Sequence, residues 1–335
     1  MSNLEEKCYV GIDVAKAKLD VFILSSNEHF TIDNNGRGIE NLVEKIMKLG
    51  ARETIHVAME STGGYEQLAA SLLSKEGLKV SILNSRQVRD FAKSMNKLAK
   101  TDKIDARIIA QYARVVMPRE TLQNRVEIKK ITQLENRRRQ LLEAIRAEKN
   151  RLDKNCEYAK DSIKRMIEHI RKELKEIDAE LEKAVNEDKI CAEKRAILMS
   201  VKRIGKITAH ALIAHLPELG HMSGKQITAL CGLAPFNRDS GALRGKRAVW
   251  GGRKIVRVSL YMATLVAIKY NAYIGAFYKK LIAQRKAKMT AVTAAMHKLL
   301  LILNAMMKSG SCWDEEKEKK YLEAMNKEIG VSLKV

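Results

Sequence analysis

Residues 8–33 read CYVGIDVAKAKLDVFILSSNEHFTID, and three strand-like runs follow one another within this stretch. A helical pattern from Ile39 to Leu49 comes next, and two further strand-like runs, TIHVAME at 54–60 and LKVSIL at 78–83, are separated by another helical pattern. Strands joined by short turns pair antiparallel, whereas strands joined through helices pair parallel. We therefore expect residues 1–118 to form an α/β domain whose mixed sheet has an antiparallel edge.

Residues 119–195 have a different pattern, in which apolar side chains recur every three or four positions. Ile131, Leu134 and Leu141 belong to this stripe in the first half, and Ile163 and Ile167 belong to it in the second. Because such a stripe is buried only against another helix, we expect an antiparallel helical hairpin, or coiled coil, that turns near 156–161. The alternative is an oligomerisation arm, and we expect this region to contact another subunit in a dimer or tetramer.

The net charge of +22 is concentrated in residues 196–310, which hold 19 Lys and Arg residues but only two acids, Glu218 and Asp239. The resulting excess of +17 indicates a polyanionic partner, for which DNA is the natural candidate. Membrane binding is disfavoured because the longest apolar run is interrupted by His297 and Lys298. The N-terminus also lacks a secretory signal, so we expect a cytoplasmic protein that contacts no membrane.

The basic segment opens with a helical pattern, a glycine turn and a second helical pattern, within MSVKRIGKITAHALIAHLPELG at 199–220. This order resembles a helix-hairpin-helix element, although a plain helical turn fits equally well. Gly205 would let backbone N–H groups approach a phosphate, and Lys202, Arg203 and Lys206 would add positive charge. Further helices are expected up to about residue 307, followed by a charged tail at 311–335.

Four acidic residues stand out in the first domain. Period-two alternation places Asp13 with Tyr9 and Gly11, opposite the aliphatic face of the first strand. Glu60 ends the strand TIHVAME at the edge where α/β sheets usually place their ligands. Asp102 and Asp105 are three residues apart at the start of a helix, and such a pair repels unless a cation lies between them. The alternative is that this pair only caps the helix.

The ordered motifs resemble those of the DEDD-type bacterial insertion-sequence transposases, the insertion sequence 110 family. They are GIDVAKAKLDV at 11–21, MESTGGY at 59–65, KTDKIDARIIAQYA at 100–113, GLAPFNRDSG at 232–241, RGKRAVWGGR at 244–253 and SLYMA at 259–263. The first domain of that family is similar to Holliday-junction resolvases, which implies an RNase H-like fold here. The resemblance further implies that the four acids bind metal and that Ser240 is the nucleophile of a C-terminal transposase domain.

The surroundings of Ser240 suit a hydroxyl that attacks phosphate, because glycines allow close approach and cations stabilise the crowded oxyanion. The basic residues expected to contact nucleic acid around this loop are Arg238, Arg244, Lys246, Arg247, Arg253 and Arg257. The alternative interpretation is a loop that only grips DNA, in which Ser240 makes a single hydrogen bond.

The resemblance implies a transposase or recombinase that cleaves and rejoins donor and target DNA. Mg²⁺ or Mn²⁺ is the expected cofactor, since carboxylates are hard oxygen ligands. A structured guide RNA is the expected second partner, because members of the family are understood to use an RNA from their own element. A hydrolytic Holliday-junction-type nuclease and a non-enzymatic nucleic-acid-binding protein remain the two alternatives.

Overall fold

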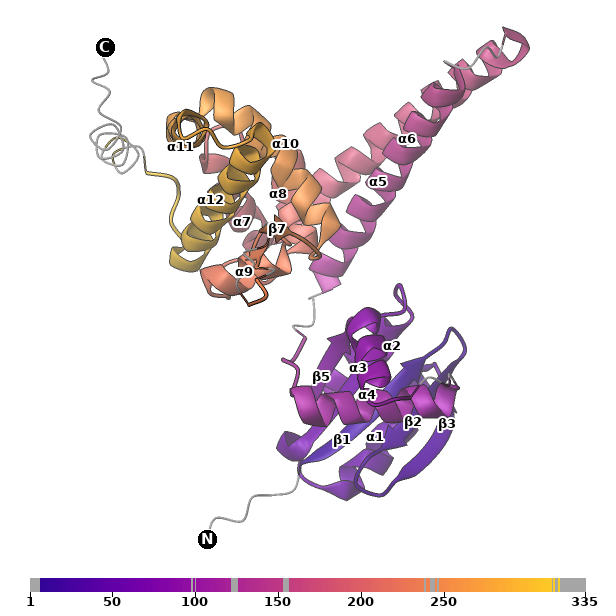
Figure 1. Ribbon diagram of the computed structural model, residues 1–335. Coiled ribbons are helices and arrows are strands. Elements are labelled where there is room, and N and C mark those ends of the chain that lie inside the picture. The colour runs from indigo at the N-terminus through magenta and orange to yellow at the C-terminus, as the bar shows by residue number, and fades with distance from the viewer. Residues whose placement is uncertain are drawn as a thin grey trace. The chain divides into compact units, whose positions relative to one another are not determined.

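A computed structural model describes residues 7–97, 99, 101–121, 126–152, 157–237, 239–241, 245, 247–314, 316 and 319 (Figure 1). The chain divides into two compact units, Met1–Gln123 and Asn124–Val335. Each unit has a hydrophobic core of its own. The division therefore falls just before the first long helix of the predicted hairpin, which belongs to the second unit.

The first unit is built on a five-stranded sheet with the strand order β3-β2-β1-β4-β5. Its strands are β1 (Cys8–Val14), β2 (Lys18–Ile23), β3 (Glu28–Asp33), β4 (Ile55–Glu60) and β5 (Lys79–Leu83). The β1–β2 and β2–β3 pairs are antiparallel, whereas the β1–β4 and β4–β5 pairs are parallel. The predicted mixed sheet with an antiparallel edge is confirmed, and β1 is its central strand.

Helices cover both faces of this sheet, and each face of β1 contributes its own residues to the packing. The helices are α1 (Gly36–Ile46), α2 (Glu66–Lys75), α3 (Ser85–Ser94) and α4 (Asp102–Val116). Val10, Ile12 and Val14 pack in one core with residues of α1 and α2, including Leu42 and Leu73. The opposite face is covered by α4, whose buried side chains pack with Tyr9 of β1. The predicted alternation along the first strand is therefore present.

Gly11 sets how closely α4 approaches β1. A Cβ atom at this position would lie 2.1 Å from the carbonyl oxygen of Ala106 and 2.4 Å from the backbone nitrogen of Ala110. Both alanines are fully buried and pack beside Phe22 of β2. Small residues on both elements thus bring the helix backbone against the strand, and they fix the first turn of α4 over the end of β1 that carries Asp13.

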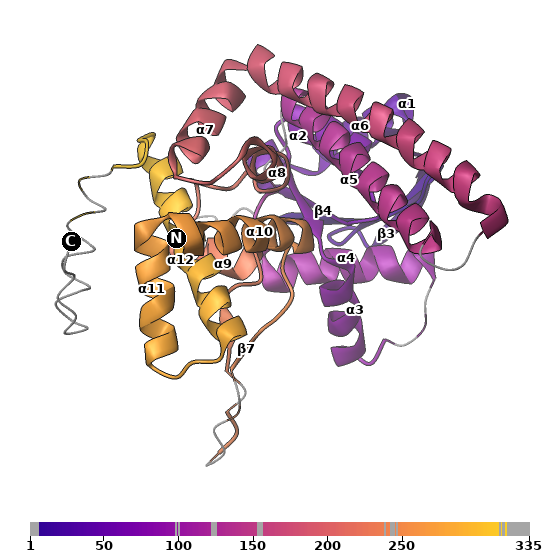
Figure 2. The same cartoon turned by 90° about the horizontal axis from the view of Figure 1, so that it is seen from above.

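The second unit begins with a long helical hairpin, α5 (Val126–Leu152) and α6 (Lys160–Glu187). The helices are antiparallel, since Lys130 pairs with Glu187 and Arg138 pairs with Asp178, and Figures 1 and 2 show them side by side. The outer part of the hairpin has an apolar seam of Leu141, Ile145, Ile163, Ile167 and Ile170. Of the turn predicted near 156–161, residue 156 lies outside the described residues, as do residues 153–155 before it. A short 3-10 turn at Glu157–Ala159 leads into α6.

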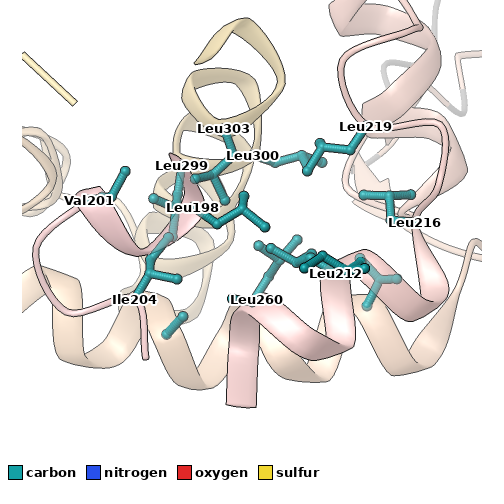
Figure 3. Close-up of a cluster of buried hydrophobic side chains, with 14 of the residues drawn as sticks. Leu198, Val201, Ile204, Leu212, Leu216, Leu219, Leu260, Leu299, Leu300 and Leu303 are labelled. Carbon is teal, nitrogen blue, oxygen red and sulfur yellow. The ribbon is translucent and has the colours of Figure 1, made fainter. Parts of the chain in front are cut away.

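The base of the hairpin packs into a helical body. Its helices are α7 (Lys189–Ser200), α8 (Lys206–His215), α9 (Gly224–Leu230), α10 (Lys254–Tyr270), α11 (Ala272–Ala283) and α12 (Lys288–Ser309). Figure 3 shows Leu198, Leu212, Leu260, Leu299 and Leu303 of four of these helices in one buried cluster. A short antiparallel ribbon, β6 (Pro235–Phe236) paired with β7 (Ala248–Val249), stands at the base of the loop that carries Ser240.

Helix α12 is long and apolar enough to cross a membrane by length and composition alone, and it is the one such helix in the described part of the chain. Half of its most apolar window is buried inside the protein. The buried residues include Ala295, Leu299, Leu300 and Leu303, which belong to the core of the second unit. The apolar character of α12 is therefore accounted for by core packing.

Candidate functional site

Asp13 and Glu60 lie level with each other on one face of the sheet. In the parallel β1–β4 pair Gly11 is opposite Ala58 and Ile12 is opposite Met59, so the next position brings Asp13 beside Glu60. Ala58, two residues before Glu60, packs in the core under α4 together with Tyr9. Because side chains two residues apart in a strand share a face, Asp13 and Glu60 both lie on the α4 face.

Asp102 and Asp105 occupy the first turn of α4, as the sequence predicted. The side-chain cap of this helix is Thr101, whose hydroxyl oxygen accepts a hydrogen bond from the backbone N–H of Ile104 at 3.3 Å. Neither aspartate is needed as the N-cap, although both lie where the helix dipole favours negative charge. Asp102 is exposed and Asp105 is half-buried.

The structure thus gathers four acidic side chains at one end of the α4 face, and we call them the carboxylate cluster. Its members are Asp13, Glu60, Asp102 and Asp105. Burial, and after it the negative charges of Asp105, Glu60 and Asp102 in decreasing order, together raise the pKa of Asp13 from 3.8 to about 6. The other three acids are therefore close enough to Asp13 to repel its negative charge.

The chemistry of the carboxylate cluster fits a divalent cation. Carboxylate oxygens are the ligands that Mg²⁺ and Mn²⁺ prefer, and a cation would relieve the repulsion that raises the pKa of Asp13. Within the described residues, no three histidine, cysteine or acidic side chains already stand in a closed metal-binding arrangement. An ion bound here would therefore require the carboxylates to turn towards it.

The turn that follows Glu60 is held by a buried acid that sequence patterns did not single out. Glu66 is only 3% exposed, and one of its carboxylate oxygens accepts hydrogen bonds from the backbone N–H groups of Thr62 and Gly64 at 3.1 and 2.9 Å. Burial alone would raise the pKa of Glu66, but these and further hydrogen bonds lower it below its usual value. The adjacent glycines Gly63 and Gly64 were the available sequence signal for a tight turn, and both have a positive φ in the structure.

Ser240 lies in the second unit, in the loop between β6 and β7, and its side chain is exposed. The loop base is tightly packed, because a Cβ atom on Gly232 would lie 2.1 Å from the carbonyl oxygen of Gly251. Next to the serine, the Asp239 carboxylate accepts a hydrogen bond from the backbone N–H of Gly245 at 3.1 Å. The carboxylate cluster and Ser240 thus belong to different units of the chain.

The arginines of this region have different surroundings. Arg253 donates two hydrogen bonds to the carboxylate of Glu218, at 2.6 and 2.5 Å, and a third to the carbonyl of His215. Arg257 donates to the carbonyl of Gly251. Both therefore have intramolecular partners that brace the loop base, whereas Arg247 is exposed. The predicted contacts Arg238, Arg244 and Lys246 lie outside the described residues.

The predicted helix-hairpin-helix region places Gly205 as the N-cap of α8, with open space around it. Lys206 reaches Glu182 of α6 at 3.2 Å, and the guanidinium of Arg203 lies 4.5 Å from the centre of the Tyr270 ring. Lys202 also interacts with another group of the protein, through a hydrogen bond or an electrostatic contact. Two of the predicted phosphate contacts, Arg203 and Lys206, therefore also link neighbouring helices within the unit.

Two comparisons place the chain among known proteins. One family model, described as "Transposase", matches residues 10–157, and a second, described as "Transposase IS116/IS110/IS902 family", matches residues 195–279. A "Pilin gene-inverting protein" from Moraxella bovis is 28% identical over 321 residues, which are 92% of this chain and 98% of that relative. A protein of the same description from Moraxella lacunata is 28% identical over 324 residues, with the same coverage.

The first model spans the whole carboxylate cluster, and the second spans the Ser240 loop and most of the helical body. The likeness therefore covers both sets of candidate residues in their order along the chain. The chain belongs to the IS116/IS110/IS902 family of transposases, enzymes that cleave and rejoin DNA strands.

Proposed function

We propose that the protein is a DNA recombinase in which the carboxylate cluster holds Mg²⁺ or Mn²⁺ and Ser240 attacks the scissile phosphodiester. The observation that carries this proposal is the gathering of four acids from two strands and a helix start on one face of the sheet, where burial and the charges of the other three acids raise the pKa of Asp13 to about 6. A purely structural set of acids gains nothing from such repulsion, whereas a bound cation would relieve it.

We further assign an RNase H-like fold to the first unit. The support is the strand order β3-β2-β1-β4-β5 with an antiparallel edge formed by the first three strands. In this assignment the catalytic domain spans residues 1–118, the hairpin spans 119–195 and the transposase domain spans 196–310, with the charged tail at 311–335. The carboxylate cluster then stands over the central strand of the catalytic domain.

The proposed reaction transfers a phosphoryl group twice. The Ser240 oxygen forms a bond to phosphorus while its hydroxyl proton leaves, and the bond from phosphorus to one strand oxygen breaks as that oxygen gains a proton. The resulting phosphoserine is then attacked by a hydroxyl of another strand, which restores Ser240 and rejoins the DNA. Divalent ions, when bound, would stabilise the charge that develops on the phosphate oxygens.

The partners of this reaction are donor and target DNA together with a structured guide RNA. The +17 charge of residues 196–310 supports binding to a phosphate backbone, and a delegated reading of sequence fits a chain without a recognisable base-reading motif. The relatives are described as inverting a gene, which supports strand exchange at defined sites here. We place this activity in the cytoplasm, in a dimer or tetramer to which the coiled-coil seam of the hairpin contributes.

Two substitutions test the two halves of the proposal. Ser240→Ala should abolish strand exchange and the protein–DNA adduct while nucleic-acid binding persists, and an active variant would remove the serine assignment. Asp102→Asn should abolish cleavage and its Mg²⁺ dependence, and unchanged activity would make the carboxylate cluster structural. Free DNA ends without any protein-linked DNA would instead identify a hydrolytic nuclease.

A further inference from the structure

Asn34 connects the two chain segments that carry Asp13 and Glu60. Its side-chain amide donates one hydrogen bond to the carbonyl of Ala15 at 3.0 Å and another to the carbonyl of Tyr65 at 3.1 Å. Ala15 lies two residues after Asp13, in the turn that leaves β1, and Tyr65 ends the turn that follows Glu60. One amide group therefore uses both of its N–H donors to bridge the two turns.

Both bridged turns are fixed by bonds of their own. The backbone N–H of Ala15 donates to the carbonyl of Lys18 at 2.9 Å, which closes the β1–β2 turn. The Glu66 carboxylate holds the other turn through Thr62 and Gly64, so the Tyr65 carbonyl is presented from a rigid loop. Asn34 itself is fixed at the end of β3 by its backbone N–H, which donates to the carbonyl of Ala17 at 2.9 Å.

The bridge leaves one polar atom of Asn34 without a hydrogen-bond partner in the described part of the chain, which costs free energy. The side-chain oxygen of Asn34 is buried, and no partner for it is found among the described residues. A buried acceptor without a partner is unfavourable, so this asparagine keeps its two donors in place despite an unsatisfied oxygen. At the same time the like charges of Asp13 and Glu60 push apart the segments that the amide joins.

We propose that Asn34 is a positioning residue of the carboxylate site, holding the Asp13 and Glu60 segments at the separation that a divalent cation needs. This inference rests on the proposed function of the carboxylate cluster. Groups that orient metal ligands without touching the metal set affinity strongly, and their loss weakens metal binding by about 10- to 100-fold. Without the bridge, the two carboxylates must be drawn together by the ion itself.

The test compares Mn²⁺ binding and Mg²⁺-dependent DNA cleavage by the full-length protein and its variants. Asn34→Ala should weaken Mn²⁺ binding, measured by the electron paramagnetic resonance signal of free Mn²⁺, by about tenfold. Cleavage by this variant should need a correspondingly higher Mg²⁺ concentration and should recover when Mg²⁺ is raised. Asn34→Asp, which keeps the shape but removes both donors, serves if the alanine variant does not fold.

Asn35→Ala is the matched control. Asn35 is the neighbouring residue of the same type, and its side chain caps α1 by accepting a hydrogen bond from the backbone N–H of Gly38 at 2.9 Å. This variant should lose stability but keep wild-type Mn²⁺ affinity. Equal losses of Mn²⁺ affinity in the Asn34 and Asn35 variants, or wild-type affinity in Asn34→Ala, would overturn the positioning role.

Asp13→Asn separates a failure of this inference from a failure of the proposed function. If Asp13→Asn abolishes Mn²⁺ binding while Asn34→Ala leaves it unchanged, the carboxylate cluster binds metal and only the role of Asn34 is wrong. If Asp13→Asn also binds Mn²⁺ like the wild type, the carboxylate cluster is not the metal site and both proposals fall.

Discussion

At the scale of single residues, the carboxylate cluster brings like charges together around the partly buried Asp13. Asp13 is partly buried beside three other acids, and its pKa lies near 6, above the 3.8 of an unperturbed aspartate. Between about pH 4 and pH 6, Asp13 is therefore mostly protonated in the folded chain but mostly ionised in the unfolded chain. Without a cation, folding becomes less favourable as the pH rises through this interval.

Asp13→Asn should consequently stabilise the metal-free protein at pH 7.5, by roughly 1–2 kcal/mol, because the amide removes a charge that is both desolvated and repelled. Urea denaturation in the presence of a chelator measures the change. The wild type should lose this stability between about pH 4 and pH 6, whereas the variant should not. A variant less stable than the wild type at pH 7.5 would show that Asp13 is not in a repulsive environment.

Individual residues differ in how far the sequence could predict them. The face of Asp13 follows from strand alternation, and the position of Asp102 and Asp105 follows from the start of a helix. The roles of Asn34 and Glu66 were not predicted from the sequence. Their partners are set by turns and, for Asn34, by a contact 31 residues away in the chain, and neither feature gives a periodic pattern. The charge of Arg253 predicted a phosphate contact but could not reveal its ion pair with Glu218.

At the scale of elements, the close approach of α4 to β1 places Asp102 and Asp105 over Asp13. Gly11→Ala should disrupt this approach, since its methyl group would lie 2.1 Å from the carbonyl oxygen of Ala106. We expect a loss of about 1–3 kcal/mol in stability, as is typical of overpacking, together with weaker Mg²⁺ dependence of cleavage. Ala106 cannot relieve the clash by changing a rotamer, because the atom concerned is backbone. A variant of wild-type stability and activity would mean that α4 is not held at this distance.

Like Asp13 in the first unit, Glu135 in the hairpin has a raised pKa. Glu135 of α5 is 7% exposed, and burial raises its pKa to about 7, an effect that Arg138 opposes and Asp178 reinforces. Because the folded-state pKa lies above the ordinary value of 4.5, the stabilising contribution is complete below that value and is lost as the pH rises through about 7.

Amides of α5 and α6 should therefore exchange their hydrogens faster at pH 8 than at pH 6, after correction for the intrinsic pH dependence of exchange. The difference in opening free energy between these two pH values should be about 1 kcal/mol, because only the last pH unit below the raised pKa of about 7 lies within this range. Glu135→Gln should abolish this difference, while Glu143→Gln, an exposed acid of the same helix, should leave it unchanged. A pH effect that survives in Glu135→Gln would assign it to another group.

Periodicity also explains which elements could be foreseen. The hairpin and the helices of the body have long apolar stripes, and the strands of the sheet alternate or form short apolar runs, so both were predictable. The β6–β7 ribbon has only two residues in each strand, which is too short for any period. The tight glycine contacts that fix the loop base, such as Gly232 against Gly251, arise only from tertiary packing.

At the scale of the whole molecule, the charges and the candidate groups are divided between the two units. The carboxylate cluster lies in the first unit, whereas Ser240 and most of the positive charge lie in the second. A DNA backbone can interact with both units. The positive charge of the second unit attracts its phosphates, and cations held by the carboxylate cluster would offset the negative charge of the phosphate that reacts. The proposed reaction therefore requires both units to act on the same phosphodiester.

Mapping the DNA–protein linkage tests this claim most directly. The full-length protein is incubated with Mg²⁺, substrate DNA and the guide RNA, the reaction is quenched with denaturant, and the modified peptide is identified by mass spectrometry. We predict a phosphate on Ser240, which is absent from Ser240→Ala and from Asp13→Asn although both variants still bind the nucleic acid. Strand exchange without protein-linked DNA, or a linkage to another residue, would contradict the account.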